Sequence, residues 1–194
     1  MPMHVRELIE KYYPEYYGWF DYPAGRTVAF NKTDEAWGVL GNFAATPLLV
    51  DGVVFDCAEK LFQVMKFTDP AARKAVYARK GMPIKWTAKG FERDGRCRSD
   101  WGEHLVDVLK FCLVTKYAQS EAFRAELART GGRFIVEQAH GRADTYSARL
   151  SDDGTTWSGG NLMGRLLMEL RDKGSLEYHL PEDILHFSDL LEDS

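Results

Sequence analysis

Helical spacing of apolar residues in the second half of the chain limits the possible folds more than any other feature. Residues 99–117 place Trp101, Leu105, Val108 and Cys112 at steps of four, three and four, which puts them on one face of a long helix. Further helices are predicted over residues 4–12, 56–67, 70–77, 120–129 and 161–173, with a helical turn over 83–89 and a short helix from Pro181. Such a chain folds mainly by packing helices against one another.

Strand signals are fewer and shorter than the helical ones. Asp51-Gly52 separates two apolar runs, 48–50 and 53–55, and this dipeptide is typical of a two-residue hairpin turn. Short strands are also predicted over 27–31 and 134–136, whereas 14–25 is expected to be an irregular arm and 138–160 a loop-rich stretch. The predicted fold class is therefore α+β, mainly helical, a single domain with a small β-hairpin or sheet as an accessory.

Composition limits the kind of ligand. The chain has 194 residues, of which 45% are hydrophobic and 28% charged, so it is long enough to bury a sizeable core. Its net charge of -4 disfavours a general binder of long duplex nucleic acid, which needs many basic side chains for phosphate contacts. A compact ligand fits this balance better, and a local basic patch stays compatible with it.

The cysteine and histidine residues are sparse and scattered. Cys57, Cys97 and Cys112 form no CxxC pair, which favours a reducing compartment, and no histidine spacing suggests a metal site. The N-terminus is charged and lacks the apolar core of a signal peptide, and no apolar run reaches the length of a membrane span. We expect a soluble cytoplasmic protein with no metal and no cofactor.

The most informative segment for chemistry is residues 56–67. On a helix, Glu59, Gln63 and Lys66 fall at positions 0, 4 and 7 and form one polar stripe bordered by apolar residues. If the helix is buried, this stripe must face a wet or ligand-filled cavity, because buried charges need partners. The alternative is that Asp56 and Glu59 form a capping box and the stripe faces solvent. Both interpretations are open from the pattern alone.

Three further segments are candidates for binding. Asn42-Phe43 offers an amide and a ring for a sugar or a base, and the alternative is a turn residue beside a core aromatic. The run 158–164 has glycines before a helix, which favour phosphate binding at the helix N-terminus, although such runs are usually plain loops. Trp101, near Arg96 and Arg98, could stack on a base or be an ordinary core residue.

Taken in order, these segments resemble the NADAR/YbiA family of N-glycosidases. The similar stretches are Gly41-Asn-Phe through Asp51-Gly52, Ala58-Glu-Lys-Leu-Phe-Gln-Val-Met-Lys66, Arg98-Ser-Asp-Trp101, Lys116-Tyr-Ala-Gln119, Thr130-Gly through Ile135-Val-Glu137, and Asn161-Leu-Met-Gly-Arg-Leu-Leu-Met-Glu-Leu-Arg171. The resemblance covers about residues 28–172. It implies a division into an N-terminal arm (1–27), a catalytic domain (28–173) and a C-terminal tail (174–194).

The resemblance implies hydrolysis of N-glycosidic bonds without a metal. One branch of the family acts on ribosylamino intermediates of riboflavin synthesis, and another removes ADP-ribose from guanine bases in nucleic acid. The active-site set would be Glu59, Lys66 and Trp101. Lys66 would either orient Glu59 or attack the ribosyl C1 as a neutral amine. The residues expected to shape the substrate pocket are Asn42, Phe43, Gln63, Arg98, Glu137, Asp144, Asn161 and Gly164.

The chain also departs from the family pattern. Gly41 replaces a serine, Lys60 replaces a histidine, and the expected Asp-x-x-Trp-Gly reads Asp144-Thr-Tyr-Ser147, with a tryptophan only later at Trp157. This non-standard periphery favours release of ADP-ribose from ADP-ribosylated guanine in nucleic acid over the riboflavin-intermediate role. A third hypothesis is a module that binds ADP-ribose or NAD without turnover. The expected partner is a small nucleotide or an ADP-ribosylated nucleic acid, with no membrane; no oligomeric state is predicted.

Overall fold

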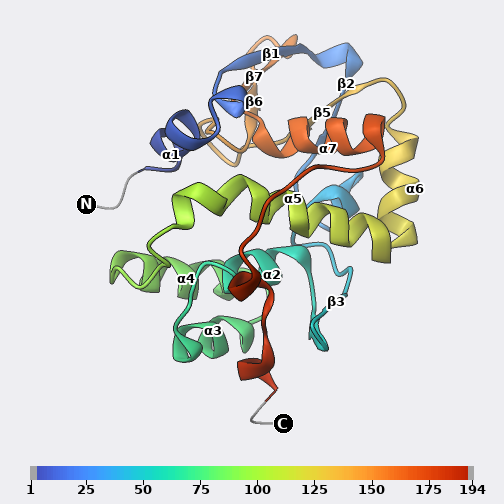
Figure 1. Ribbon diagram of the computed structural model, residues 1–194. Helices are drawn as coiled ribbons and strands as arrows, with labels where there is room; N and C mark the ends of the chain where they lie inside the picture. The colour runs from blue at the N-terminus through green and yellow to red at the C-terminus, as the bar shows by residue number, and fades with distance from the viewer. Residues whose placement is uncertain (1–3, 192–194) are drawn as a thin grey trace.

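The computed structural model describes residues 4–191, so the ends of the predicted arm and tail, 1–3 and 192–194, lie outside the described residues. The fold is α+β and mainly helical, as predicted. Figure 1 shows the strands of two small sheets at the top with α7 beneath them, α5 across the middle, and α2, α3 and α4 below. The helices are α1 (Val5–Tyr12), α2 (Ala58–Val64), α3 (Pro70–Tyr77), α4 (Pro83–Arg93), α5 (Trp101–Gln119), α6 (Glu121–Arg129) and α7 (Leu162–Lys173). None of these described helices is long and apolar enough to cross a membrane.

The strands form three separate groups. An antiparallel sheet has the order β1 (Phe20–Pro23), β7 (Thr156–Gly159), β6 (Ala148–Leu150). A parallel pair joins β2 (Thr27–Phe30) to β5 (Phe134–Glu137), and β3 (Leu48–Val50) pairs with β4 (Val53–Phe55) as a hairpin. The parallel pair matters for function, because β5 ends at Glu137 beside the start of α7.

The hairpin confirms the prediction from Asp51-Gly52. Both residues have positive φ angles, 49° and 76°, as a type I′ turn requires. Glycine adopts this region at no steric cost and aspartate tolerates it better than most residues, so the dipeptide fixes the register of Leu48 opposite Phe55.

The predictions of an irregular arm over 14–25 and of a loop-rich stretch over 138–160 were wrong. The arm contributes β1, and the stretch contributes β6 and β7. Tyr22 lies opposite Trp157 in this sheet, and the two rings belong to a second small apolar cluster. Each strand has only three or four residues. β6 and β7 are neighbours in the sequence, whereas β1 pairs with β7 from the other end of the chain, a pairing that no local pattern identifies.

Several helix bounds also differ from the prediction. The helix expected over 56–67 is shorter: α2 begins after Cys57, and Lys66 lies in the turn that follows its end. Asp56 is therefore not the N-cap, and its carboxylate accepts a hydrogen bond from Lys60 instead. The turn expected over 83–89 continues to Arg93 as α4. The final helix is a short 3-10 turn, Glu182–Leu185.

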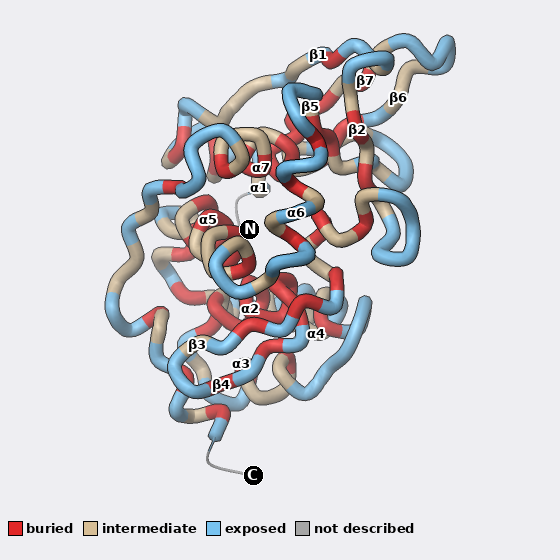
Figure 2. The backbone as a smooth tube through the Cα atoms, turned by 90° about the vertical axis from the view of Figure 1, so that its right-hand side faces the viewer, coloured by how far each residue is buried: buried red, intermediate tan, exposed pale blue. Residues whose placement is uncertain are grey.

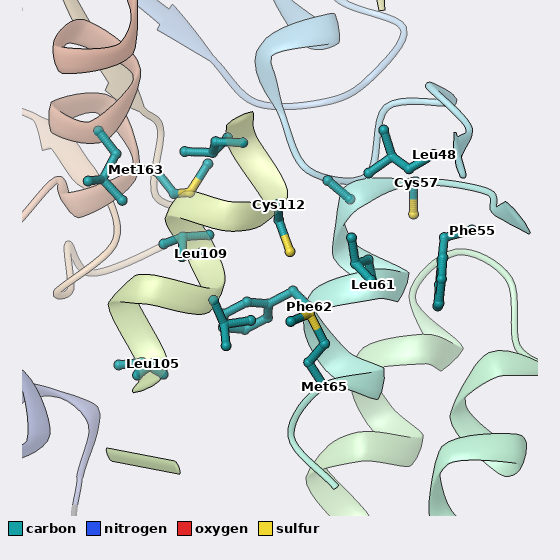
Figure 3. Packing of buried hydrophobic residues seen from close by; sticks show 14 of the residues in the cluster. Leu48, Phe55, Cys57, Leu61, Phe62, Met65, Leu105, Leu109, Cys112 and Met163 are labelled. Carbon is teal, nitrogen blue, oxygen red and sulfur yellow. The ribbon is translucent and has the colours of Figure 1, made fainter. Parts of the chain in front are cut away.

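The helix α2 lies at the centre of the main hydrophobic core. All seven of its residues are buried, and the surrounding tube is largely red in Figure 2. Figure 3 shows Leu105, Leu109 and Cys112 of α5 on one side of α2, and Leu48 and Phe55 of the hairpin on its other side. Polar side chains on such a helix are withdrawn from bulk water. Glu59 and Gln63 therefore do not form a solvent-exposed face.

Gly164 is expected to be indispensable for packing α7 against β5. A Cβ atom at this position would overlap the carbonyl oxygen of Ile135, which belongs to the backbone and cannot swing away. We expect Gly164→Ala to lower the free energy of unfolding by about 3 kcal/mol or more. Gly90→Ala on α4 is the matched control, because nothing lies within 4 Å of its Cβ position, and it should be neutral or stabilising. Urea unfolding of both variants checks this, and equal effects would refute it.

Candidate active site

Glu59 is buried inside the protein and does not face solvent. The residue is only 5% exposed. Glu59 Oε1 accepts a hydrogen bond from Gln63 Nε2 at 2.8 Å, and its backbone N–H donates to the Asn42 carbonyl at 2.9 Å. The capping-box alternative is therefore wrong, since Cys57 is the N-cap and Glu59 does not reach the backbone of Asp56. The stripe faces the inside of the molecule.

Two acceptors beside Glu59 are buried without a hydrogen-bond donor. They are Gln63 Oε1 and Asn42 Oδ1, and neither has a partner among residues 4–191. The amide nitrogen of each is engaged, with Glu59 for Gln63 and with the Met163 sulfur for Asn42. Because buried polar atoms are nearly always hydrogen-bonded, these two free acceptors are suited to the hydroxyl or amine donors of a polar ligand, and that of Gln63 belongs to the side chain that holds the Glu59 carboxylate.

Lys66 lies among different partners. Its ammonium pairs with Glu92 of α4 and lies 5.3 Å from the ring centre of Phe62 and 5.7 Å from that of Trp101. Trp101 itself is 9% exposed and stacks edge to face on Phe62. It is thus a core residue and also part of the wall around Lys66. In the described structure Gln63 holds Glu59, whereas Glu92 holds Lys66.

A second lysine, Lys85 of α4, completes the surroundings of Glu59. Its ammonium lies 3.7 Å from Glu59 Oε1 and 5.6 Å from the ring centre of Phe43. Its side chain is 43% exposed, so it lies at the boundary between the buried carboxylate and solvent. Phe43, predicted to bind substrate, is consequently near Glu59.

Tyr146 shares the electrostatic surroundings of Glu59 and Glu92. Burial is the main cause of the raised pKa of its phenol, and the charges of Glu59, Asp144, Glu92 and Glu137 raise that pKa further. The Tyr146 phenol therefore lies within electrostatic range of all four carboxylates. The sequence left open which aromatic replaces the tryptophan expected after Asp144. Tyr146 provides a ring at this place, whereas Trp157 lies in the other cluster with Tyr22.

Glu137 is the carboxyl group with the most altered acidity in this region. Burial raises its pKa to about 7, Lys85 lowers it, and the charges of Glu59 and Asp144 raise it. A carboxyl with this pKa carries a proton part of the time at neutral pH, so it can donate one to a leaving group.

The raised pKa of Glu137 predicts a pH-dependent stability. The folded state binds a proton more tightly than the unfolded state, so the contribution of Glu137 to stability is present below pH 4.5 and is lost as the pH rises toward 7. We expect Glu137→Gln to be more stable than the wild type at pH 8 and to lose this advantage near pH 4.5. Thermal unfolding of both proteins across this range checks the sign; a constant difference would refute it.

Two predicted binding residues have internal hydrogen bonds, and a third packs against the backbone of a strand. Asp144 accepts from the backbone of Tyr146 and Ser147 and from the Ser147 hydroxyl. Asn161 is fully buried, donating to the Ile135 carbonyl and accepting from the Glu137 N–H, so it fixes Glu137 in place. Gly164 packs against β5.

The start of α7 does not offer free N–H groups to a phosphate. The N–H groups of Gly160, Asn161, Leu162 and Met163 all donate to carbonyls of residues 144–147. The glycines at 159–160 serve instead to bring two backbone segments into close contact. The interpretation of 158–164 as a phosphate cradle is therefore wrong in the described structure.

Arg98 lies on the other side of Lys66. Its backbone N–H donates to the Lys66 carbonyl, and its guanidinium pairs with Asp100 and with Asp183 from the C-terminal segment. It lines a cavity of about 250 Å³ together with Arg73. Arg98 thus holds the turn that carries Lys66.

Lys116 supports the loop that carries Asn42. It is fully buried, and its Nζ donates to the carbonyls of Val39 and Gly41 at 2.7 Å each. Burial lowers its pKa to about 7, and a neutral amine has two N–H donors for these two acceptors. Gln119, one turn later, makes two hydrogen bonds with the backbone of Leu49. These contacts give a physical reason for the Lys116–Gln119 segment of the resemblance.

Sequence reasoning missed Lys85, Glu92 and Tyr146. Glu92 belongs to the second half of α4, which was not predicted. Lys85 falls within the predicted turn 83–89, but no spacing in the sequence links it to Glu59. Tyr146 lies in the stretch 138–160, which the sequence predicted to be loop-rich. The one available signal was its place beside Asp144, where the family has an aromatic residue.

Comparison with known proteins identifies the family of this chain. A family model for the NADAR domain matches residues 29–173. The N-glycosidase YbiA of Escherichia coli is 33% identical over 150 residues, covering 77% of this chain and 89% of that protein. The riboflavin biosynthesis protein VVA0006 of Vibrio vulnificus is 28% identical over 166 residues, covering 84% of this chain and 42% of that protein. The NMR structure of E. coli YbiA superimposes with a TM-score of 0.62 at 30% identity, covering 80% of this chain and 90% of that one.

The family model and the N-glycosidase relatives thus define an enzyme, a hydrolase that acts on N-glycosyl compounds. The chain belongs to the NADAR domain family.

Proposed function

We propose that this N-glycosidase releases ADP-ribose from ADP-ribosylated guanine in nucleic acid. The observation that carries the proposal is the burial of Glu59 beside two unpaired acceptors, with the aromatic rings of Phe43 and Tyr146 close by. A buried carboxylate acts on developing positive charge, unpaired acceptors bind sugar hydroxyls, and flat rings pack on a base.

Glu59 stabilises the transition state in this proposal. Breaking a ribosyl C1–N bond builds positive charge on C1 and the ring oxygen, and a nearby carboxylate interacts more strongly with that charge than with the neutral ground state. Gln63 keeps the carboxylate in one orientation through its hydrogen bond. Glu137, with its pKa raised to about 7, supplies the proton that the departing base nitrogen takes up.

Lys66 acts as the nucleophile in this proposal. The contacts support that role over the orienting one, because Gln63, and not Lys66, holds Glu59. Glu92 accepts one proton from the Lys66 ammonium, and the free amine attacks C1 as the C1–N bond breaks and the base leaves protonated. Transfer of the second amine proton to the ring oxygen opens the sugar and gives a protonated imine. Water then hydrolyses the imine, which returns the amine and releases the sugar.

One relative favours a second substrate. VVA0006 is named a riboflavin biosynthesis protein, so hydrolysis of a ribosylaminopyrimidine phosphate is the alternative. The same charge development at C1 applies to that substrate, and the geometry of Glu59 and Lys66 serves both.

A direct comparison of the two substrates tests the proposal. The protein is incubated with an ADP-ribosylated guanine oligonucleotide and, separately, with the ribosylaminopyrimidine phosphate, and the products are separated by chromatography. We expect free ADP-ribose from the first and no reaction with the second. Turnover of only the second would establish the alternative, and tight ADP-ribose binding in calorimetry without any turnover would identify a binding module.

A further inference from the structure

The segment 79–96 has a charge opposite to that of the rest of the chain. It carries six basic and two acidic side chains, a net charge of +4, so the remainder of a chain with net charge -4 carries -8. This segment covers the turn after α3 and the whole of α4. The local basic patch that the composition left open is therefore present, and it is confined to one part of the fold.

The basic side chains of this segment are exposed together with two large apolar ones. We call Arg79, Lys80, Met82, Trp86, Lys89 and Arg93 the α4 patch; all six are exposed. Trp86 is 64% exposed and Met82 is 47% exposed. Steps of four, three and four put Met82, Trp86, Lys89 and Arg93 on one face of the helix. Within residues 4–191, none of the four basic residues of the patch has an ion-pair partner.

The same helix contributes to the active site through a different face. Lys85 lies 3.7 Å from Glu59 Oε1, and Glu92 pairs with Lys66. Both side chains are partly buried, whereas their neighbours Trp86 and Arg93 are exposed. The patch therefore borders the face of α4 whose side chains contact Glu59 and Lys66. In Figure 1, α4 lies beside α2, which carries Glu59.

We propose that the α4 patch is a docking surface for single-stranded nucleic acid, which it holds with one base directed toward Glu59 and Lys66. The inference rests on the proposed function, and it adds where the polymer binds. Unpaired lysine and arginine side chains contact phosphates, and an exposed tryptophan stacks on a base of any identity. A single strand is the form that fits, because Glu59 is buried and a base inside a duplex cannot reach it.

Binding of an unmodified fluorescein-labelled single-stranded oligonucleotide, followed by anisotropy over a range of salt concentrations, tests the surface directly. We expect the double variant Lys89→Glu/Arg93→Glu to bind at least about 10-fold more weakly, and its salt slope to fall by about 1.4, since single strands contribute about 0.7 per lost phosphate contact. Trp86→Ala should weaken binding with little change in slope.

The matched control is Arg142→Glu/Arg149→Glu. These arginines line a cavity of about 460 Å³ with the exposed Trp19, far along the sequence from α4. We expect less than a twofold change for this control. An equal loss in the control and the patch variant would overturn the inference. So would binding to vesicles containing phosphatidylserine without binding to the oligonucleotide.

Turnover separates this inference from the proposed function. Rates are measured with an ADP-ribosylated guanine oligonucleotide and with ADP-ribosylated guanosine. The patch variant should raise KM for the oligonucleotide about 10-fold and leave the kinetics of the nucleoside unchanged. If the wild type binds oligonucleotides through the patch but releases ADP-ribose from neither substrate, the docking surface stands and the proposed function fails. If it cleaves the oligonucleotide and the patch variant has an unchanged KM, the function stands and the docking surface fails.

Discussion

Glu59→Gln is expected to lower kcat for ADP-ribose release by at least roughly 10²–10³-fold, the range found when one charge-stabilising group is removed from an active site. The amide has nearly the same shape but cannot carry the negative charge that C1 requires in the transition state. Because Glu59 is buried and its closest cation, Lys85, is 3.7 Å away and half exposed, the fold should tolerate the neutral side chain.

The control for this variant is Glu121→Gln at the exposed start of α6, which should retain full activity. Circular dichroism and urea unfolding of both variants establish that the fold is intact. A Glu59→Gln protein that keeps wild-type specific activity would show that the buried carboxylate is only structural.

Lys66→Met is expected to abolish turnover and, with it, covalent trapping of the substrate. If the Lys66 amine forms an imine with the opened sugar, borohydride added during turnover reduces it to a stable secondary amine. Mass spectrometry of the digested wild-type protein should find the adduct on the peptide that contains Lys66. The methionine fills a similar volume against Phe62 and Trp101, so the fold is retained.

The matched control is Lys85→Met, which removes the other lysine near Glu59. Its adduct should still form on Lys66. An adduct on Lys85 in the wild type would show that Lys85, and not Lys66, is the nucleophile. A Lys66→Met protein that turns over at the wild-type rate would exclude any chemical role for this side chain.

Much of the fold followed from local patterns. The Asp51-Gly52 turn specified a hairpin through its positive φ angles, and the 4-3-4 spacing from Trp101 specified α5. The pairing of β1 with β7 did not follow, because its register sets Tyr22 opposite Trp157, and these residues are far apart in the sequence. Local periodicity contains no information on which short extended segments find each other.

The candidate site, too, could be predicted from the sequence only in part. The spacing of Glu59, Gln63 and Lys66 predicted a common face, and the structure buries Glu59 and Gln63 and leaves Lys66 partly buried in the turn after α2. The separate partners of Glu59 and Lys66 could not be predicted, because Lys85 and Glu92 come from α4 and Tyr146 from a loop. These contacts depend on tertiary packing of α4 beside α2. The burial of Glu59 and Gln63 excludes the solvent-face interpretation, and this burial could not be read from the sequence.

The position of the bound ribose tests the central claim most directly. A crystal structure of the Glu59→Gln variant with ADP-ribose would locate the sugar C1 atom. We predict that C1 lies in contact with Lys66 Nζ and with the residue 59 side chain, with the sugar hydroxyls donating to Gln63 Oε1 or Asn42 Oδ1. A ribose ordered in the cavity beside Trp19, with the interior around residue 59 unchanged, would contradict the account.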